Sequence, residues 1–87
     1  MPTEQTRERT LLILTALAPK PLHGYAVLHE VTRLSGGRVR LQPGSLYGAL
    51  ERLVKEGLVE RAGEEVVEGR RRQYFQLTPQ GHEYLSG

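Results

Sequence analysis

Residues 41–58 constrain the fold most, because their pattern specifies one helix with two dissimilar faces. Pro43 suits the first turn of a helix, where its fixed φ fits and its missing N–H costs nothing. Apolar residues recur after it at helical spacing, and Gly57 can adopt the left-handed conformation that ends a helix. The opposite face is small at its start and basic towards its end. We therefore predict a helix over about residues 43–56 whose polar face can lie in the major groove of DNA.

Two further helices are predicted before this segment and one near the end of the chain. Apolar residues at helical spacing predict a first helix over about residues 4–18, which the following prolines end. A second helix is predicted over about residues 23–35, where two glycines follow it. Thr78 followed by Pro79 is typical of a helix start, so a short last helix is expected over about residues 79–86.

Strand signals complete the order of elements. A short strand is predicted over residues 38–41, and a β-hairpin over about residues 58–77 with a polar turn at residues 63–69. In the second hairpin strand Phe75 and Leu77 alternate with polar neighbours and should point inward. Three helices followed by a hairpin form a winged helix-turn-helix, a mainly α fold with a small β-hairpin (α+β). In this fold the third helix is the recognition helix and the hairpin is the wing.

Size and composition fit one small domain spanning residues 1–87, with a marginal core of its own. The chain has no cysteine, so neither disulfides nor thiolate metal sites can stabilise it, which fits a reducing cytoplasm. No segment is long enough to cross a bilayer, and the N-terminus lacks the layout of a secretion signal. We expect a soluble cytoplasmic protein with no membrane association.

The first predicted helix is apolar nearly all the way round over residues 11–18. A small domain cannot normally cover both sides of such a helix, so a second copy of the chain is the simplest partner. The alternative is a helix wedged deep within a monomer. The candidate dimer-interface residues come from the first and last helices: Leu11, Leu12, Leu14, Tyr84 and Leu85.

Seven short motifs follow one another in register: His23-Gly24-Tyr25, Ser35-Gly36-Gly37, Leu41-Gln42-Pro43-Gly44-Ser45-Leu46-Tyr47, Leu50-Glu51-Arg52-Leu53, Glu56-Gly57-Leu58-Val59, Gly69-Arg70-Arg71-Arg72-Gln73-Tyr74-Phe75 and Leu77-Thr78-Pro79-Gln80-Gly81. In this order they resemble PadR-like transcriptional regulators, over about residues 11–85. Such proteins usually continue from the fourth helix into a longer helical region that builds the dimer, whereas this chain stops at Gly87. The resemblance thus implies a dimer that depends on the first and last helices, or one weaker than its relatives form. Because the chain has no tryptophan, an aromatic effector pocket like that of some members is not expected.

Six residues of the recognition helix are candidate DNA contacts: Gly44, Ser45, Tyr47, Gly48, Arg52 and Lys55. The small residues at the start let the helix approach DNA closely, and the Ser45 hydroxyl and the helix N-terminus can donate to a phosphate. Tyr47 can reach a phosphate or a thymine methyl group. The two basic residues further along suit the DNA backbone, although a solvated helix face is the simpler interpretation of either one alone.

The wing supplies a second group of candidate contacts. Arg70, Arg71 and Arg72 repel one another, and a phosphate backbone would relieve that repulsion. The structural alternative is pairing with glutamates of the first hairpin strand. We assign at least one of the arginines to the minor groove or its phosphates. Tyr25 on the second helix can bond a phosphate, or it can be a half-buried ring at the edge of the core.

The sequence offers no basis for an enzyme, a cofactor or a metal site. Motifs for a nucleophile, a phosphate-binding loop or a carboxylate cluster are absent. The three histidines are scattered, and each is expected to be a surface or capping residue rather than a metal ligand.

The leading hypothesis is a homodimeric transcriptional repressor that binds double-stranded DNA at a pseudo-palindromic operator through the third helix and the wing. An effector that changed the angle between the two heads would release DNA, but no residue set identifies a small-molecule effector. Two alternatives are a winged-helix module for protein–protein interaction and an accessory DNA-binding subunit without operator recognition of its own. Salt discriminates between DNA and protein binding, because phosphate contacts weaken steeply as salt rises.

Overall fold

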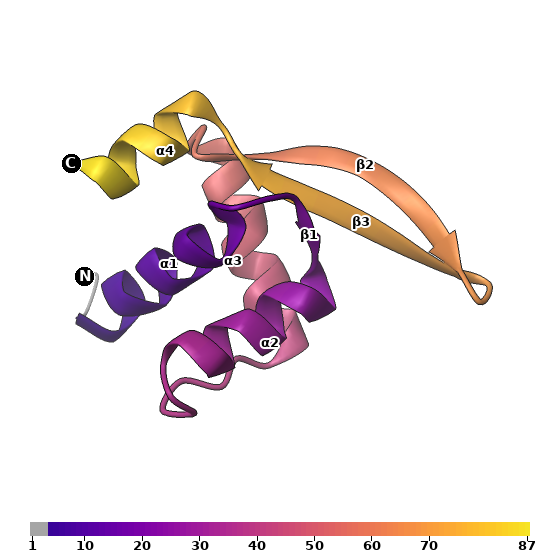
Figure 1. Ribbon diagram of the computed structural model, residues 1–87, viewed down its shortest axis with the longest axis horizontal. Helices are drawn as coiled ribbons and strands as arrows, with labels where there is room; N and C mark the ends of the chain where they lie inside the picture. Colours follow the sequence, from indigo (N-terminus) through magenta and orange to yellow (C-terminus); the bar gives the residue numbers. More distant parts are fainter. Residues whose placement is uncertain (1–3) are drawn as a thin grey trace.

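The computed structural model describes residues 4–87, and their elements follow the predicted order with one addition and one omission. They are α1 (Glu4–Leu17), β1 (Leu22–His23), α2 (Gly24–Leu34), α3 (Pro43–Lys55), β2 (Val59–Val67), β3 (Arg70–Leu77) and α4 (Pro79–Ser86). Figure 1 shows α1, α2 and α3 packed together while the β2–β3 hairpin projects far beyond them, with α4 beside α1 on the side away from the hairpin tip. This is a winged helix-turn-helix, so the predicted fold class is confirmed.

The core forms where the three helices meet the base of the sheet. Its fully buried large side chains come from α1, α2, α3 and β2: Ile13, Leu14, Leu17, Val27, Val31, Leu46, Leu50, Leu53 and Val59. The leucines of α3 recur at helical spacing, so a single stripe of that helix faces inward. Phe75 and Leu77 of β3 point inward, as the alternation predicts, and are 2% and 6% exposed.

α1 buries one side and leaves part of the other open. Leu14 is completely buried, so its predicted place in a dimer interface is wrong: the domain's own core uses this side chain. Leu11 lies on the outer side of α1 and is 36% exposed, and Tyr84 of α4 is 47% exposed. Leu12 and Leu85 are half-buried against the core. The surface left for a partner is therefore narrower than the sequence suggests.

The sheet has three antiparallel strands in the order β1-β3-β2. β1 was not expected from the sequence, because two residues carry no periodic signal. It pairs with β3 so that Leu22 lies opposite Phe75 and His23 lies opposite Tyr74. This pairing joins the start of α2 directly to the base of the wing.

The first strand of the wing is longer, and the turn is tighter, than predicted. The polar turn expected at residues 63–69 is wrong, because β2 continues to Val67 and the turn consists of Glu68 and Gly69. Both turn residues have positive φ, 51° and 77°, the arrangement whose twist matches that of the flanking strands. A bulge between Arg61 and Gly63 marks the point where the hairpin leaves the domain.

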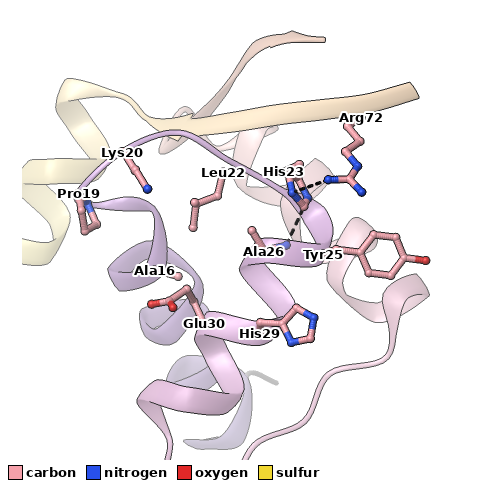
Figure 2. Close-up of a pocket in the computed structure, with 10 residues that line it drawn as sticks. All are labelled: Ala16, Pro19, Lys20, Leu22, His23, Tyr25, Ala26, His29, Glu30 and Arg72. Carbon is pink, nitrogen blue, oxygen red and sulfur yellow. Dashed lines mark hydrogen bonds between the residues drawn. The ribbon is translucent and has the colours of Figure 1, made fainter. Parts of the chain in front are cut away.

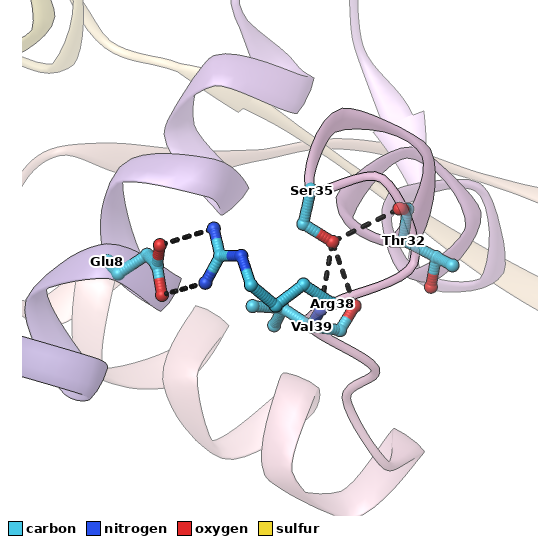
Figure 3. Close-up of polar contacts among 5 residues, drawn as sticks. All are labelled: Glu8, Thr32, Ser35, Arg38 and Val39. Atoms are coloured by element: carbon cyan, nitrogen blue, oxygen red, sulfur yellow. Dashed lines mark hydrogen bonds and ion pairs between the residues drawn. The ribbon is translucent and has the colours of Figure 1, made fainter.

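The strand predicted at residues 38–41 is also wrong, because this segment is a loop. Its backbone bonds to a side chain and not to a neighbouring strand: the Val39 N–H donates to the Ser35 hydroxyl at 2.9 Å. Figure 3 shows this contact beside a second one, in which Arg38 donates to both carboxylate oxygens of Glu8 at 2.6 and 2.8 Å. This hydrogen bond lowers the pKa of Glu8 and ties the loop to α1.

Candidate nucleic-acid interface

The N-terminus of α3 is open to solvent. Its N-cap residue, Gln42, makes no side-chain hydrogen bond to the helix, and Pro43 follows at the first helical position. The next two residues, Gly44 and Ser45, are exposed. An uncapped helix N-terminus presents backbone N–H groups and a positive dipole end, so this end of α3 can receive a phosphate.

The outer face of α3 has room for a partner. A Cβ atom built on Gly44 or Gly48 would meet no atom within 4 Å. Nothing inside the domain therefore requires glycine at either position, whereas close approach of a second molecule would. Tyr47 lies between them, 42% exposed, and Lys55 at the end of the helix makes no ion pair with any residue that the structure describes.

Tyr47 also fixes how α3 meets α2. Its ring lies against the backbone of Gly24, the first residue of α2, where an added Cβ would come within 2.3 Å of the tyrosine hydroxyl oxygen. Gly24 is buried by this contact, which explains why a glycine precedes Tyr25 in the chain. Tyr25 itself is 54% exposed, so the interpretation of it as a half-buried ring is not supported.

Arg52 contacts α1, and exposed Ser45 lines a cavity together with it. The Arg52 guanidinium donates to the hydroxyl of Thr10 at 2.9 Å and lies 3.2 Å from the carboxylate of Glu56. Ser45 and Arg52 line one small cavity between α1 and α3. These contacts favour a structural role for Arg52, and its predicted contact with DNA stays a prediction.

The three wing arginines have three different environments. Arg70 is exposed and makes no ion pair with any side chain that the structure describes. Arg71 lies 3.9 Å from Glu64, too far for a strong pair, and its side chain is 75% exposed. Arg72 is half-buried, with a guanidinium nitrogen 3.2 Å from the His23 ring. Of the three arginines, Arg71 alone therefore has a glutamate partner in the described wing, and that pair is weak.

His23 links α2 to the wing (Figure 2). Its Nδ1 accepts a hydrogen bond from the Ala26 N–H at 3.3 Å, so it is the N-cap of α2. Its ring also packs edge-on against Tyr74, with centroids 5.5 Å apart. Burial lowers the pKa of His23 below its usual 6.5, and the charge of Arg72 lowers it further. A capping role is what the sequence predicts, whereas the contact with the wing depends on tertiary structure.

The candidate contact residues converge where α2, α3 and the wing meet. A groove of about 100 Å³ lies there, lined by His23, Gly24, Tyr25, Tyr47 and residues 70–72. The structure thus brings together the two tyrosines and the wing arginines. It leaves Arg52 and Ser45 outside this groove, on the α1 side of α3.

Most of the chain, including the helices and the wing that form this groove, matches a known protein family. Residues 13–87 match the transcriptional regulator PadR-like family. The chain belongs to this family. The PadR-like fold and function are those of transcriptional regulators rather than enzymes.

Two curated proteins are similar to most of this chain. The chain is 48% identical over 81 residues to an uncharacterized 37.1 kDa protein in a transposon of Streptomyces fradiae, covering 93% of this chain but only 22% of that protein. It is 36% identical over 76 residues to the transcriptional regulator Rv3488 of Mycobacterium tuberculosis, covering 87% of this chain and 67% of that one. The first of these relatives is therefore much longer than the chain.

Solved structures of PadR-like and related regulators share the fold. A transcriptional regulator from Clostridium thermocellum superposes with a TM-score of 0.79 at 25% identity, over 97% of this chain and 82% of that one. Bacillus subtilis PadR in complex with operator DNA superposes with a TM-score of 0.76 at 20% identity, over 88% of this chain and 44% of that one.

Two absences apply to the described part of this PadR-like chain. The side chains that the structure describes, those of residues 6–87, include no group of three or more histidines, aspartates or glutamates placed to hold a metal ion. No helix within the same residues is long and apolar enough to cross a membrane.

Proposed function

We propose that this PadR-like protein is a repressor that binds a pseudo-palindromic operator as a homodimer. The observation that carries the proposal is the groove at which Tyr25, Tyr47 and the wing arginines converge, next to the open N-terminal face of α3. In this arrangement α3 enters the major groove while Arg70 and Arg71 contact the flanking backbone or minor groove. The same fold holds operator DNA in Bacillus subtilis PadR, which supports this placement.

A second copy of the chain is the proposed partner for the outer surface of α1 and α4. Leu11 and Tyr84 are exposed there, with half-buried Leu12 and Leu85 beside them. The formal net charge of +2 is small for one domain that binds DNA alone, and a dimer doubles the number of phosphate contacts. Two-fold symmetry would place the two recognition helices in successive major grooves. Such a protein acts in the cytoplasm, where the DNA lies.

Footprinting on genomic fragments, followed by fluorescence anisotropy on the protected fragment, tests the function. We expect protected half-sites with centres about one helical turn apart, and an affinity that falls steeply with salt. A scrambled duplex of the same length should bind more weakly. Salt-insensitive binding to protein partners without any footprint would favour the protein-interaction module instead.

Sedimentation tests the dimer. Leu11→Glu places a charge on the outer side of α1 and should convert the dimer to a monomer without unfolding it, since the side chain is not part of the core. Leu11→Met is the matched control and should leave the dimer intact. A wild-type protein that sediments as a monomer at high concentration would contradict the proposed interface.

A further inference from the structure

A second cavity of the domain shares His23, Tyr25 and Arg72 with the groove in which DNA is proposed to bind. It measures about 770 Å³, within the range of small-molecule sites, and opens between the end of α1, β1, the first turns of α2, and β3. Figure 2 shows Ala16, Leu22 and Ala26 as its apolar part, with Lys20 and Arg72 at its edge. The cavity therefore combines an aliphatic floor with a cationic rim.

Two hydrogen-bond donors face each other at this rim. In the tautomer in which His23 Nδ1 accepts from the Ala26 N–H, the ring hydrogen is on Nε2. Nε2 lies 3.2 Å from a guanidinium nitrogen of Arg72, which is also a donor. In this tautomer neither group accepts from the other. An oxygen of an anion placed beside them could accept from both.

The charge of the lining selects the ligand. Lys20 and Arg72 are positive and make no ion pair with a described residue. Among the described residues that line the cavity, Glu30 carries the one carboxylate, and Arg33 holds that carboxylate at 2.7 Å. The lining is net positive, so it favours a ligand with a single negative charge. The aliphatic floor of the cavity suits the apolar part of such a ligand.

We propose that this cavity binds a small organic monoanion, a carboxylate on an aliphatic chain, with the carboxylate beside His23 Nε2 and the Arg72 guanidinium and the chain over Ala26 and Leu22. Lys20 supplies a second positive charge at the entrance. Charge-assisted hydrogen bonds to the guanidinium and the imidazole fix the acidic end, and burial of the chain supplies the apolar contribution.

Ligand binding at this site also affects the wing. Arg72 and His23 line both the cavity and the groove in which the preceding section places DNA, so a carboxylate and a DNA phosphate compete for the same donors. This consequence rests on the proposed function. It makes the cavity an effector site within one domain, without any contribution from a further helical region.

A titration monitored by amide ¹⁵N–¹H NMR of the whole chain tests the site with sodium octanoate as the probe and octanamide as the matched neutral compound. We expect saturable shifts of the Leu22, Ala26 and Arg72 amides, with octanamide about tenfold weaker or more, because the amide loses the charge-assisted contacts. Shifts confined to the outer side of α1 around Leu11, no saturable shift, or equal affinity for the two probes would overturn the proposal.

Three variants locate the carboxylate and the chain. Arg72→Gln should weaken octanoate about tenfold and leave octanamide unchanged, whereas Ala26→Leu should exclude both by filling the floor. Arg40→Gln removes the same charge from the exposed loop before α3 and should bind octanoate like the wild type. Octanoate binding that survives Arg72→Gln and Ala26→Leu, in proteins whose spectra show an intact fold, would place the ligand elsewhere and overturn the assignment.

Competition with DNA is measured by anisotropy at constant ionic strength, with sodium chloride replacing octanoate in the control. Octanoate should weaken operator binding by the wild type and have no effect on Arg72→Gln. Octanoate binding by NMR with unchanged DNA affinity would overturn the coupling while the site stands. A protein that binds no DNA would refute the proposed function, and the NMR titration would still decide the site.

Discussion

Arg52 in the helical body and two arginines at the tip of the wing, Arg70 and Arg71, have opposite environments. In the body, Arg52 is bonded to Thr10 and Glu56, so its charge is already used within the domain. In the wing, Arg70 makes no ion pair with any described residue, and Arg71 has a carboxylate no nearer than 3.9 Å. We therefore expect Arg70 and Arg71, rather than Arg52, to contact phosphate.

The two regions also differ in what stabilises them. α3 in the body contributes three fully buried leucines, at positions 46, 50 and 53. The wing beyond the bulge has no such core, and Val66 near its tip is 70% exposed. Substitutions in the body should therefore change stability first, and substitutions in the wing should change binding first.

The largest expected effect is on the stability of the body. Leu50→Ala should lower the free energy of unfolding by about 2–5 kcal/mol, because it leaves a cavity in a fully buried position. Urea denaturation followed by circular dichroism measures the loss. The matched control, Val66→Ala in the wing, should stay within about 0.5 kcal/mol of the wild type. Equal losses in the two variants would remove the distinction between body and wing.

The next effect is on DNA binding by the wing. Replacing Arg70 and Arg71 together by glutamine should weaken binding to every duplex, and the slope of log affinity against log salt should flatten by about 2. The unfolding free energy should hardly change, because both side chains are exposed. Anisotropy titrations at several salt concentrations measure the slope. An unchanged slope would remove the wing from the proposed interface.

Arg52→Gln should change stability and leave DNA binding unchanged, and the change in stability should be smaller than that of Leu50→Ala. Loss of the hydrogen bond to Thr10 should lower the unfolding free energy by about 0.5–1.5 kcal/mol, since the threonine hydroxyl is buried between α1 and α3. The salt slope of DNA binding should stay that of the wild type. A slope that falls by about 1 instead would return Arg52 to the group of phosphate contacts.

Elements with a strong local signal could be predicted from the sequence. The prolines, the apolar spacing of α3 and the Thr78 cap, which accepts from the Gly81 N–H at 3.0 Å, define helices by contacts within a few residues. β1 and the partner of Arg52 could not be predicted, because each depends on a chain segment that is remote in sequence and close only in the folded domain. The predicted strand at residues 38–41 failed for a related reason: a side chain, that of Ser35, replaces the strand partner.

The candidate site, too, could be predicted from the sequence only in part. Tyr25, Tyr47 and the wing arginines were identified from motifs, and the structure places them around one groove. Which arginine is free could not be known, because it depends on where Glu64 and His23 lie relative to β3. Leu14 was assigned to the surface because an apolar helix pattern does not show which side the core covers.

The smallest expected effect is a pH dependence at the junction of body and wing. The pKa of His23 is lowered by burial and by Arg72, while Glu65 acts in the opposite direction and His29 adds a small lowering. Above the unfolded value of 6.5 the ring is neutral in both states, so it contributes no pH dependence. As the pH falls through 6.5, the His23 ring becomes protonated in the unfolded chain but stays neutral in the folded protein. Stability should therefore decrease with falling pH until the lowered pKa is reached, and below it this contribution is constant.

His23→Asn isolates this contribution, because asparagine can still cap α2 but does not titrate. Urea denaturation between about pH 7.5 and about pH 5.5 should show a smaller loss of stability for the variant than for the wild type. His82→Asn, at an exposed position of α4, is the matched control and should follow the wild type. If His23→Asn and the wild type lose stability in parallel, the imidazole is not the group that couples the wing to the body. The contact between Arg72 and His23 would then be a consequence of packing rather than a proton-sensitive joint.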